Sequence, residues 1–331
     1  MTNETTAVAG IAAWVAVFLS ERAAELSPYS VIHLRASLMP MARALPGDIG
    51  AVTYADLRAY VDALALRYKP GTLRPTVGDI RQFWRWAKRK RLIDRNPAKR
   101  LRPPSRRVVT ESAAPKSAPE SDVAQVLGYL AGRLSGVVYR DLFGNLCPAS
   151  LPEWSEDARH AARDLFVLAF LYETGCRAGE LHTLPRRAMV DATAAPGPVY
   201  RVVASGKTGA VTLRFTAPVA ELWLVWDAVR PAVCAYAVYG WKSDGLPSAM
   251  TTQTISRMLA RHCERVGVMP FRAHALRHAK VKRARGAVGL ETAARLIGHS
   301  SAAMTAAYGV ADDGELEAAA LATGLSGRLW G

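Results

Sequence analysis

The sequence has few cysteines, and they form no metal-binding pattern. Cys147, Cys176, Cys234 and Cys263 are far apart among 331 residues, with no CxxC pair and no Cys/His ligand spacing. Scattered single cysteines are typical of reduced, mostly buried thiols in a cytosolic protein. We therefore expect neither a disulfide framework nor a zinc site.

Long hydrophobic runs are also missing. The apolar stretch Ala7–Leu19 is shorter than the ~20 residues that a membrane-spanning helix needs. Glu4 precedes it, and there is no basic segment of the kind that opens a secretory signal. We expect a cytoplasmic protein, associated with the nucleoid, that has no membrane partner.

Acidic residues are in short supply. The chain has 43 lysines and arginines against 28 aspartates and glutamates, a formal net charge of +15. Such an excess supplies affinity for a phosphate backbone through counterion release. A basic protein with no polyanionic partner is the alternative, and the size of the excess favours nucleic acid. No carboxylate cluster suited to a catalytic metal is visible, and we expect no cofactor.

The length predicts two domains, because 331 residues exceed one ordinary core and half of them are apolar. Residues 104–120 are rich in Ser, Ala and Pro, follow a basic run and show no periodicity, which predicts a linker. We therefore expect a helical, DNA-binding N-terminal domain over residues 1–103 and a second domain over residues 121–331. No internal repeat is present.

The periodicity of the first domain is helical. Residues 8–44 carry apolar positions at helical spacing, with a turn at Ser27. Thr53 is a candidate N-cap for a helix over Tyr54–Leu66. A further helix is expected over Leu73–Lys90, with Phe83-Trp84-Arg85-Trp86 near its end, and core packing is the favoured explanation for at least one of the two tryptophans.

The second domain is predicted to be mainly α with one small β-hairpin. The hairpin is expected over Val199–Ala204 and Val211–Phe215, joined by a Gly-containing turn. Residues Asp141–Asp157 look like a loop. The expected helices are Ser121–Leu134, with Ser121 as its cap, Ala158–Tyr172, Val219–Val229, Thr252–Val266, Leu276–Arg285, Glu291–Ile297, Met304–Tyr308 and Glu315–Leu321.

Basic residues crowd the end of the first domain. Twelve lysines and arginines lie between Arg81 and Arg107, with Asp94 as the single acid. This density predicts a segment that lies along DNA, although a solvated basic face is the alternative. The predicted DNA contacts are Arg81, Arg85, Lys88, Arg89, Lys90, Arg91, Lys99 and Arg100, with Lys280 and Lys282 in the second domain.

Several residues of the second domain could carry chemistry, and each also has a structural explanation. Arg177 could bind a phosphate while Glu180 orients it, or the two could form a simple ion pair. Lys207 stands at the tip of the expected hairpin, where a lysine is usually just solvated. His274 and Arg277 share one helix face at a spacing of three, yet lone histidines such as His274 and His299 are more often packed than catalytic.

The combination points to phosphoryl transfer. Two arginines, a lysine, two histidines and the late Tyr308 are the groups that a covalent phosphotyrosine mechanism requires. Paired guanidinium groups neutralise the charge that develops on the non-bridging oxygens. A tyrosine serves as nucleophile, and a lysine or histidine protonates the leaving oxygen.

The second domain resembles the catalytic domain of the tyrosine recombinases, the family of phage integrases and Xer-type recombinases. The matching segments follow the family's order: TGCRAGEL, SGKTG, HALRH and LIGHSSAAMTAAY, in which His299 precedes Tyr308 by nine residues. The first domain is similar to the family's core-binding domain, especially in IRQFWRWAKRKRLIDRNPAKRL, residues Ile80–Leu101.

The resemblance implies roles for individual residues. Tyr308 would attack the scissile phosphate and form a 3′-phosphotyrosyl link, while Arg177 and Arg277 clamp the non-bridging oxygens. Lys207 would be the general acid for the 5′-oxygen. The remaining implied roles are proton handling by His274, phosphate binding by His299, support of Arg177 by Glu180, and a structural role for His278.

The resemblance also implies partners. It predicts site-specific DNA recombination or integration by a homotetramer assembled on two sites of double-stranded DNA, with accessory DNA-bending or directionality proteins and a mobile-element context. Neither a metal nor ATP is implied. The alternatives are a type IB topoisomerase, a telomere resolvase, or a non-catalytic DNA-binding regulator on the same fold.

Three segments depart from the family pattern. Residues 279–282 (AKVK) replace a small Ser/Thr-containing stretch, and Gly309-Val310 follow the tyrosine where a polar pair is frequent. Val137–Asp157 is predicted to be an extra loop.

Overall fold

The computed structural model describes residues 10–103, 117–141, 144–206, 209–230, 234–241, 247–297 and 313–325. The chain forms two compact units, Met1–Glu111 and Ser112–Gly331. The division falls inside the stretch that the sequence predicts as a linker. The end of that stretch packs with the second unit: Ala118 is buried, and its N–H donates to the carbonyl of Ala275 at 3.1 Å.

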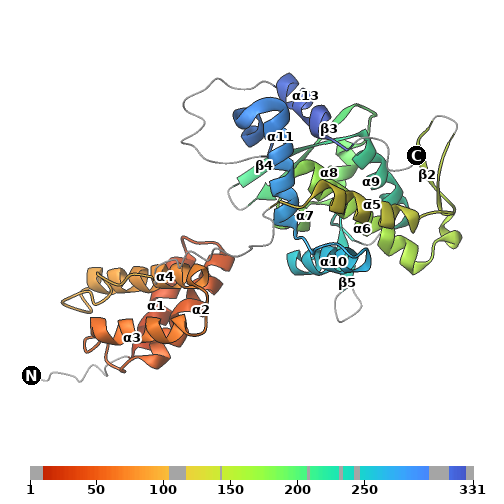
Figure 1. Cartoon of the computed structure of the whole chain (residues 1–331). Coiled ribbons are helices and arrows are strands. Elements are labelled where there is room, and N and C mark those ends of the chain that lie inside the picture. Colours follow the sequence, from red (N-terminus) through yellow and green to blue (C-terminus); the bar gives the residue numbers. More distant parts are fainter. Residues whose placement is uncertain are drawn as a thin grey trace, which may run out of the picture. The chain divides into compact units, whose positions relative to one another are not determined.

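Within residues 10–103, the described part of the first unit, the chain forms four helices (Figure 1): α1 (Ile11–Ala23), α2 (Pro28–Ala44), α3 (Tyr54–Ala65) and α4 (Pro70–Arg89). The expected helices are confirmed within a few residues. Ser27 Oγ accepts the N–H of Ser30 and caps α2. Thr53 and Asp56 bond each other's backbone N–H groups in a capping box, which fixes the start of α3.

Aromatic side chains fill the core of the first unit. Phe83, Trp84 and Trp86 of α4 are all buried, and Phe83 meets Phe18 of α1 edge-to-face at a centroid distance of 5.7 Å. The indole N–H of Trp86 donates to Glu21 at 2.9 Å. The aromatic residues therefore hold α4 against α1 and leave the basic residues of α4 outside.

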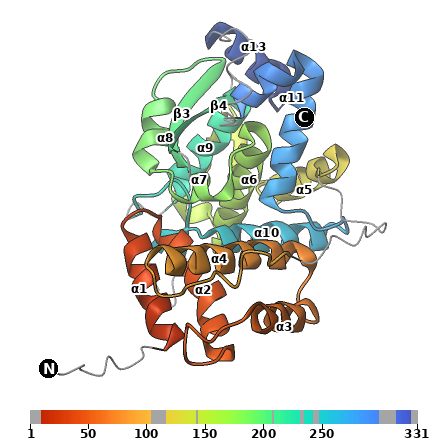
Figure 2. The ribbon, with the colours of Figure 1, turned by 90° about the vertical axis from the view of Figure 1, so that its left-hand side faces the viewer.

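The second unit is built around α6 (Glu156–Thr174), whose residues from Ala161 to Thr174 are all buried. Four elements pack against α6 (Figure 2): α5 (Glu120–Gly132), α9 (Ala217–Val229), α11 (Ala273–Leu296) and strand β4 (Gly209–Thr216). A helix buried on all sides explains the continuous apolar stretch in its sequence. The other helices are α7 (Ala178–His182), α8 (Arg186–Ala192), α10 (Thr252–Arg265), α13 (Asp313–Thr323) and the 3₁₀ helix η1 (Leu151–Glu153).

Among the described residues of the second unit there are also three two-stranded antiparallel sheets. β3 (Val199–Gly206) pairs with β4 in the expected hairpin, so the prediction of a mainly α domain with a small β component is confirmed. The other pairs are β1 (Val138–Arg140) with β2 (Leu146–Pro148) and β5 (Tyr239–Trp241) with β6 (Pro247–Ala249). The prediction of a plain loop over Asp141–Asp157 is wrong, because backbone pairing with β1 orders β2 there.

One detail of the helix predictions changes. The cap of α5 is Pro119 and not Ser121, whose hydroxyl instead donates to Asp122. The two helices expected over residues 276–297 are confirmed: α11 consists of two helical segments separated by a kink at Gly289, whose φ of +80° and ψ of 172° are not helical. The helix expected over Met304–Tyr308 lies outside the described residues. None of the described helices is long and apolar enough to cross a membrane.

A buried polar cluster joins α6 to α10. Asp164 accepts hydrogen bonds from Arg163 Nε at 2.8 Å and pairs with His262 Nε2 at 2.8 Å, and all three residues are buried. Burial by itself raises the pKa of the Asp164 carboxyl, but the hydrogen bond from His262 and the charge of Arg163 outweigh it and hold that pKa below its usual value.

We expect Asp164→Asn to lower the free energy of unfolding by about 3 kcal/mol, because it leaves Arg163 buried without its counter-charge. Because the pKa of Asp164 is lower in the folded state than in the unfolded state, its ionised carboxyl stabilises the natural protein above pH ~4. This stabilisation is lost as the pH falls through the folded-state pKa. Urea titrations of the variant at pH 7 and at acid pH will measure both effects. Asp191→Asn, which removes an exposed ion pair with Arg187, serves as the control and is expected to change stability by less than about 0.5 kcal/mol.

Candidate active site

Arg177 stands at a sharp turn between two helices. Gly175 ends α6 in the left-handed conformation, with φ of +66°, and Arg177 is the residue that precedes α7. Glu180, which is buried, accepts the backbone N–H of Arg177 and its Nη1, each at 2.7 Å. The arginine side chain is 42% exposed. The pair thus acts as an ion pair and also aims a solvent-facing guanidinium in a fixed direction.

Arg277 lies in the first turns of α11 and is almost fully buried. Its Nη1 donates to the carbonyl of Gly175 at 2.7 Å, and its Nη2 donates to the carbonyl of Ile297 at 3.0 Å. Burial lowers the pKa of Arg277, and the nearby charge of Arg177 acts in the same direction. The guanidinium groups of Arg177 and Arg277 are near enough for their charges to repel each other, and an anion bound between them would relieve this repulsion.

His274 lies one turn before Arg277 on the same helix. Its ring meets that of His278 edge-to-face, with centroids 4.6 Å apart. Burial lowers the pKa of His274, and the charges of His278, Arg277 and Arg177 add to the effect. The imidazole is therefore mainly neutral near pH 7 and can accept a proton.

Three of the predicted catalytic residues, Lys207, His299 and Tyr308, lie outside the described residues. The described residues just before two of them, Lys207 and His299, lie next to the residues that orient the arginine pair or to the pair itself. A Cβ on Gly206, the residue before Lys207, would lie 3.2 Å from Glu180 Oε1. Ile297, two residues before His299, supplies a carbonyl to Arg277.

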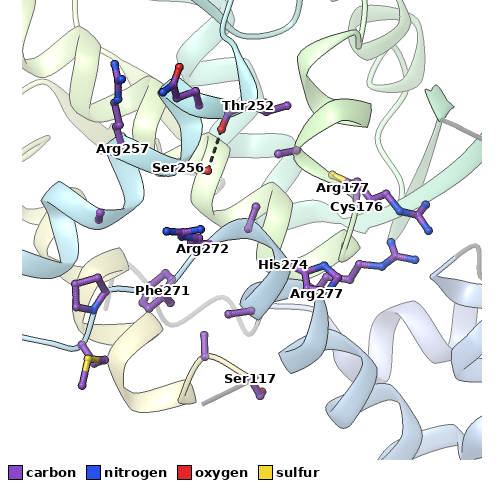
Figure 3. A pocket seen from close by; sticks show the side chains of 18 of the residues that line it. Ser117, Cys176, Arg177, Thr252, Ser256, Arg257, Phe271, Arg272, His274 and Arg277 are labelled. Atoms are coloured by element: carbon purple, nitrogen blue, oxygen red, sulfur yellow. Dashed lines mark hydrogen bonds between the residues drawn. The ribbon is translucent and has the colours of Figure 1, made fainter. Parts of the chain in front are cut away.

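A hollow of about 1070 Å³ opens beside these residues. Arg177, His274 and Arg277 line one part of it, and Figure 3 shows both guanidinium groups extending in the same direction. The lining continues along the polar face of α10, whose members in the hollow are Thr252, Gln253, Ser256, Arg257 and Ala260. These residues of α10 belong to none of the sequence motifs that predicted the site.

The sequence does contain a pattern that indicates the polar face of α10. Ile255, Met258 and Leu259 are buried at helical spacing, so the opposite, polar face of the same helix must point outward. Arg272, in the segment that leads into α11, is exposed and lines the same hollow. The hollow therefore combines a wall of donors with the arginine pair.

The two lysines assigned to DNA in the second unit differ. Lys282 is exposed. Lys280 is 1% exposed, and its ammonium donates to the carbonyl and the hydroxyl of Thr323. The prediction that Lys280 contacts DNA is wrong, because the side chain points into the protein behind the arginine pair.

The basic residues predicted to contact DNA in the first unit are all exposed. Arg81, Arg85, Lys88 and Arg89 of α4 fall near one another on a helix face. Arg85, Lys88 and Arg89 line a hollow of about 480 Å³ together with Arg22, Gln82 and Asn96. Arg81, Lys99, Arg100 and Arg102 line a second one of about 540 Å³.

No group of three or more His, Cys, Asp or Glu side chains suited to a metal ion occurs among the residues that the structure describes.

The fold is that of the tyrosine recombinases. Lambda integrase (residues 75–356), solved as a dimer bound to a COC′ core site, aligns with a TM-score of 0.60 and 13% identity over 90% of this chain and 94% of its own. XerH recombinase bound to difH aligns with a TM-score of 0.60 and 15% identity over 96% and 97%. The Tn1549 transposon integrase, in complex with a circular intermediate DNA, aligns with a TM-score of 0.60 and 15% identity over 93% and 98%.

The model of the phage integrase family matches residues 149–315, half of the chain. The protein therefore belongs to the phage integrase family. No curated protein sequence shows a significant match to it.

Proposed function

We propose that this protein is a site-specific DNA recombinase that cuts and rejoins strands through a 3′-phosphotyrosyl intermediate. The observation that carries the proposal is the convergence of Arg177, Arg277 and His274 on one hollow. Gly206, which precedes Lys207, and Ile297, two residues before His299, lie against Glu180 and Arg277. Family membership supports it independently.

Two arginines suit the phosphate transition state. When a nucleophile adds to phosphorus, negative charge increases on the non-bridging oxygens. Arg177 is oriented by Glu180 and Arg277 by two backbone carbonyls, so little reorganisation is needed when the phosphate arrives. The phosphate also relieves the repulsion between the two guanidinium groups.

The proposed reaction exchanges one ester bond for another. The Tyr308 hydroxyl attacks phosphorus, a new O–P bond forms, and the bond to the 5′-oxygen breaks. His274, neutral near pH 7, accepts the phenolic proton, and Lys207 protonates the departing 5′-oxygen. His299 donates to the phosphate. The energy of the broken bond is kept in the phosphotyrosine, so rejoining by a 5′-hydroxyl requires no ATP.

DNA binding is assigned to the basic surfaces of both units. Lysines and arginines of the first unit, with Lys282, contact the phosphate backbone, while the polar face of α10 faces the duplex beside the reacting phosphate. Dimers and a tetramer on DNA are seen for lambda integrase, and we propose a tetramer on two sites here. Accessory DNA-bending proteins would set the direction of the reaction.

Capture of covalent adducts tests the proposal without knowledge of the target sequence. The full-length protein is incubated with a library of nicked duplexes of random sequence, denatured in detergent, and recovered with any DNA that stays attached. Sequence-enriched adducts are expected. Duplex binding without any adduct would contradict the proposal and favour a non-catalytic regulator. Relaxation of plasmids regardless of sequence would favour a topoisomerase.

We expect Glu180→Gln to slow adduct formation about ten- to hundredfold, because a neutral amide cannot accept both N–H groups of Arg177 and leaves the guanidinium unoriented. Duplex affinity should change little, since the charge of Arg177 remains. Single-turnover kinetics on the enriched duplex will measure the rate. Glu156→Gln, whose side chain is 83% exposed at the start of α6, is the matched control.

A further inference from the structure

A buried polar cluster connects the end of α13 to the back of the arginine pair. Thr323, the last residue of α13, accepts from Lys280 Nζ through its carbonyl at 3.2 Å and through its hydroxyl at 2.5 Å. Leu325 donates its N–H to Glu173 at 2.9 Å, and the other carboxylate oxygen of Glu173 accepts the N–H of Thr216. Lys280, Glu173 and Thr323 are all buried.

The chain end fits closely against β4. A Cβ on Gly324 would lie 2.8 Å from the side chain of Thr216, so only glycine permits this approach. α13 packs on α11 through Ala319 and Ala320, and Glu317 pairs with Arg201 of β3. The glycine contact and two buried ionisable side chains, Lys280 and Glu173, hold the end of the helix.

The stem of Lys280 contacts the other side of the cluster. A Cβ on Gly175 would lie 3.1 Å from both Cβ and Cγ of Lys280, so these methylene groups pack against the backbone of Gly175. The carbonyl of Gly175 holds Arg277, and Arg177 follows two residues later. One side chain therefore touches both the helix end and the peptide that orients the arginine pair.

We propose that Lys280 is a positioning residue that couples docking of α13 to the geometry of Arg177 and Arg277. Its methylene stem supports Gly175, and its amine holds Thr323. Tyr308 is five residues before the start of α13, a span of at most about 18 Å, so docking also limits where the tyrosine can go. The effect on DNA cleavage rests on the proposed function, whereas the docking equilibrium does not.

Docking of α13 is linked to the protonation state of Lys280. Burial lowers the pKa of Lys280 to about 7, with the charge of Glu173 on α6 opposing the shift and that of Arg283 on α11 adding to it. No titratable side chain of α13 acts on Lys280 among the described residues. Release of α13 returns the amine to water and to its ordinary pKa, so the released state binds one more proton. Docking is therefore favoured as the pH rises from about 7 toward 10.

Hydrogen exchange of the α13 amides in the full-length protein measures docking directly. For the natural protein, the equilibrium constant for opening should fall roughly ten- to hundredfold between pH 7 and pH 9, after correction for intrinsic exchange chemistry. Lys280→Met keeps the stem and cannot titrate, so its opening constant should stay flat. Gly324→Ala should raise the opening constant of α13 at every pH while leaving its pH dependence as in the natural protein. Lys282→Met, at an exposed position of α11, is the surface control and should behave like the natural protein.

If the opening constant of α13 depends on pH equally in the natural protein and in Lys280→Met, the proposal is overturned.

A second measurement tests the link between Lys280 and the arginine pair. Lys280→Ala, which removes the stem, should slow adduct formation about tenfold or more at unchanged duplex affinity, and Lys280→Met should restore the rate to within roughly threefold. Cleavage by Lys280→Ala at the natural rate would also overturn it. If Lys280→Ala does not fold, the proposal is tested by the pH dependence of α13 opening in the natural protein and in Lys280→Met. If the natural protein itself forms no adduct, the proposed function fails while the exchange experiment still decides the docking.

Discussion

Replacement of Arg277 by alanine should slow adduct formation about 10²- to 10³-fold, the loss seen when a preorganised oxyanion donor is removed. The effect is large because Arg277 is buried and held by the carbonyls of Gly175 and Ile297, so no other side chain can move into its place. Single-turnover cleavage of a nicked duplex measures the rate, and a mobility-shift titration measures binding, which should weaken less than about tenfold.

Two further variants make the result interpretable. Arg285→Ala removes an exposed charge eight residues later on the same helix and should leave the cleavage rate unchanged. Arg277→Lys keeps a positive charge but offers no planar fork to two carbonyls and a phosphate, so it should remain strongly impaired. A cleavage rate for Arg277→Ala close to that of the natural protein would remove Arg277 from the proposed clamp.

Tyr308→Phe should abolish the covalent adduct, because the phenolic oxygen is the atom proposed to bond to phosphorus and phenylalanine has no nucleophile to replace it. Duplex affinity should remain nearly unchanged, since one hydroxyl contributes little to a contact dominated by phosphate charge. Detergent-resistant adducts, followed by mass spectrometry of the modified peptide, will identify the attachment point.

Tyr200→Phe provides a matched control, because it removes a tyrosine hydroxyl on β3 that accepts the N–H of Gly197 away from the arginine pair. It should form adducts normally. An adduct that persists in Tyr308→Phe would assign the nucleophile to another residue.

Local sequence signals were enough to predict most elements of the fold. Helical periodicity located α1–α4, α6, α9 and α10 within a few residues, and the Gly-containing turn located the β3–β4 hairpin. Arg177, Glu180, His274 and Arg277 were identified because their spacing matches an ordered set of motifs. The predictions of the helices and of the hairpin depend on residues near one another in the sequence, which is why they succeed without the fold.

The remaining features depend on contacts between distant segments. Lys280 was predicted to bind DNA because it stands in a basic run, yet the packing of α13 on α11 buries it. The hairpin of β1 and β2 went unrecognised because each strand has three residues, too few to show an alternating pattern. The part of α10 in the hollow was overlooked because its function follows from its position beside Arg177 and not from its own motif.

The distribution of thiols has a practical consequence for labelling. Cys176, next to Arg177, is fully buried, and burial raises the pKa of its thiol to about 12, so it offers almost no reactive thiolate. Cys234 and Cys263 are buried as well, while Cys147 on β2 is partly exposed. Figure 1 shows β2 at the edge of the second unit opposite α11. A maleimide dye should therefore attach mainly at Cys147, giving a fluorescent reporter far from the arginine pair without any substitution in the chain.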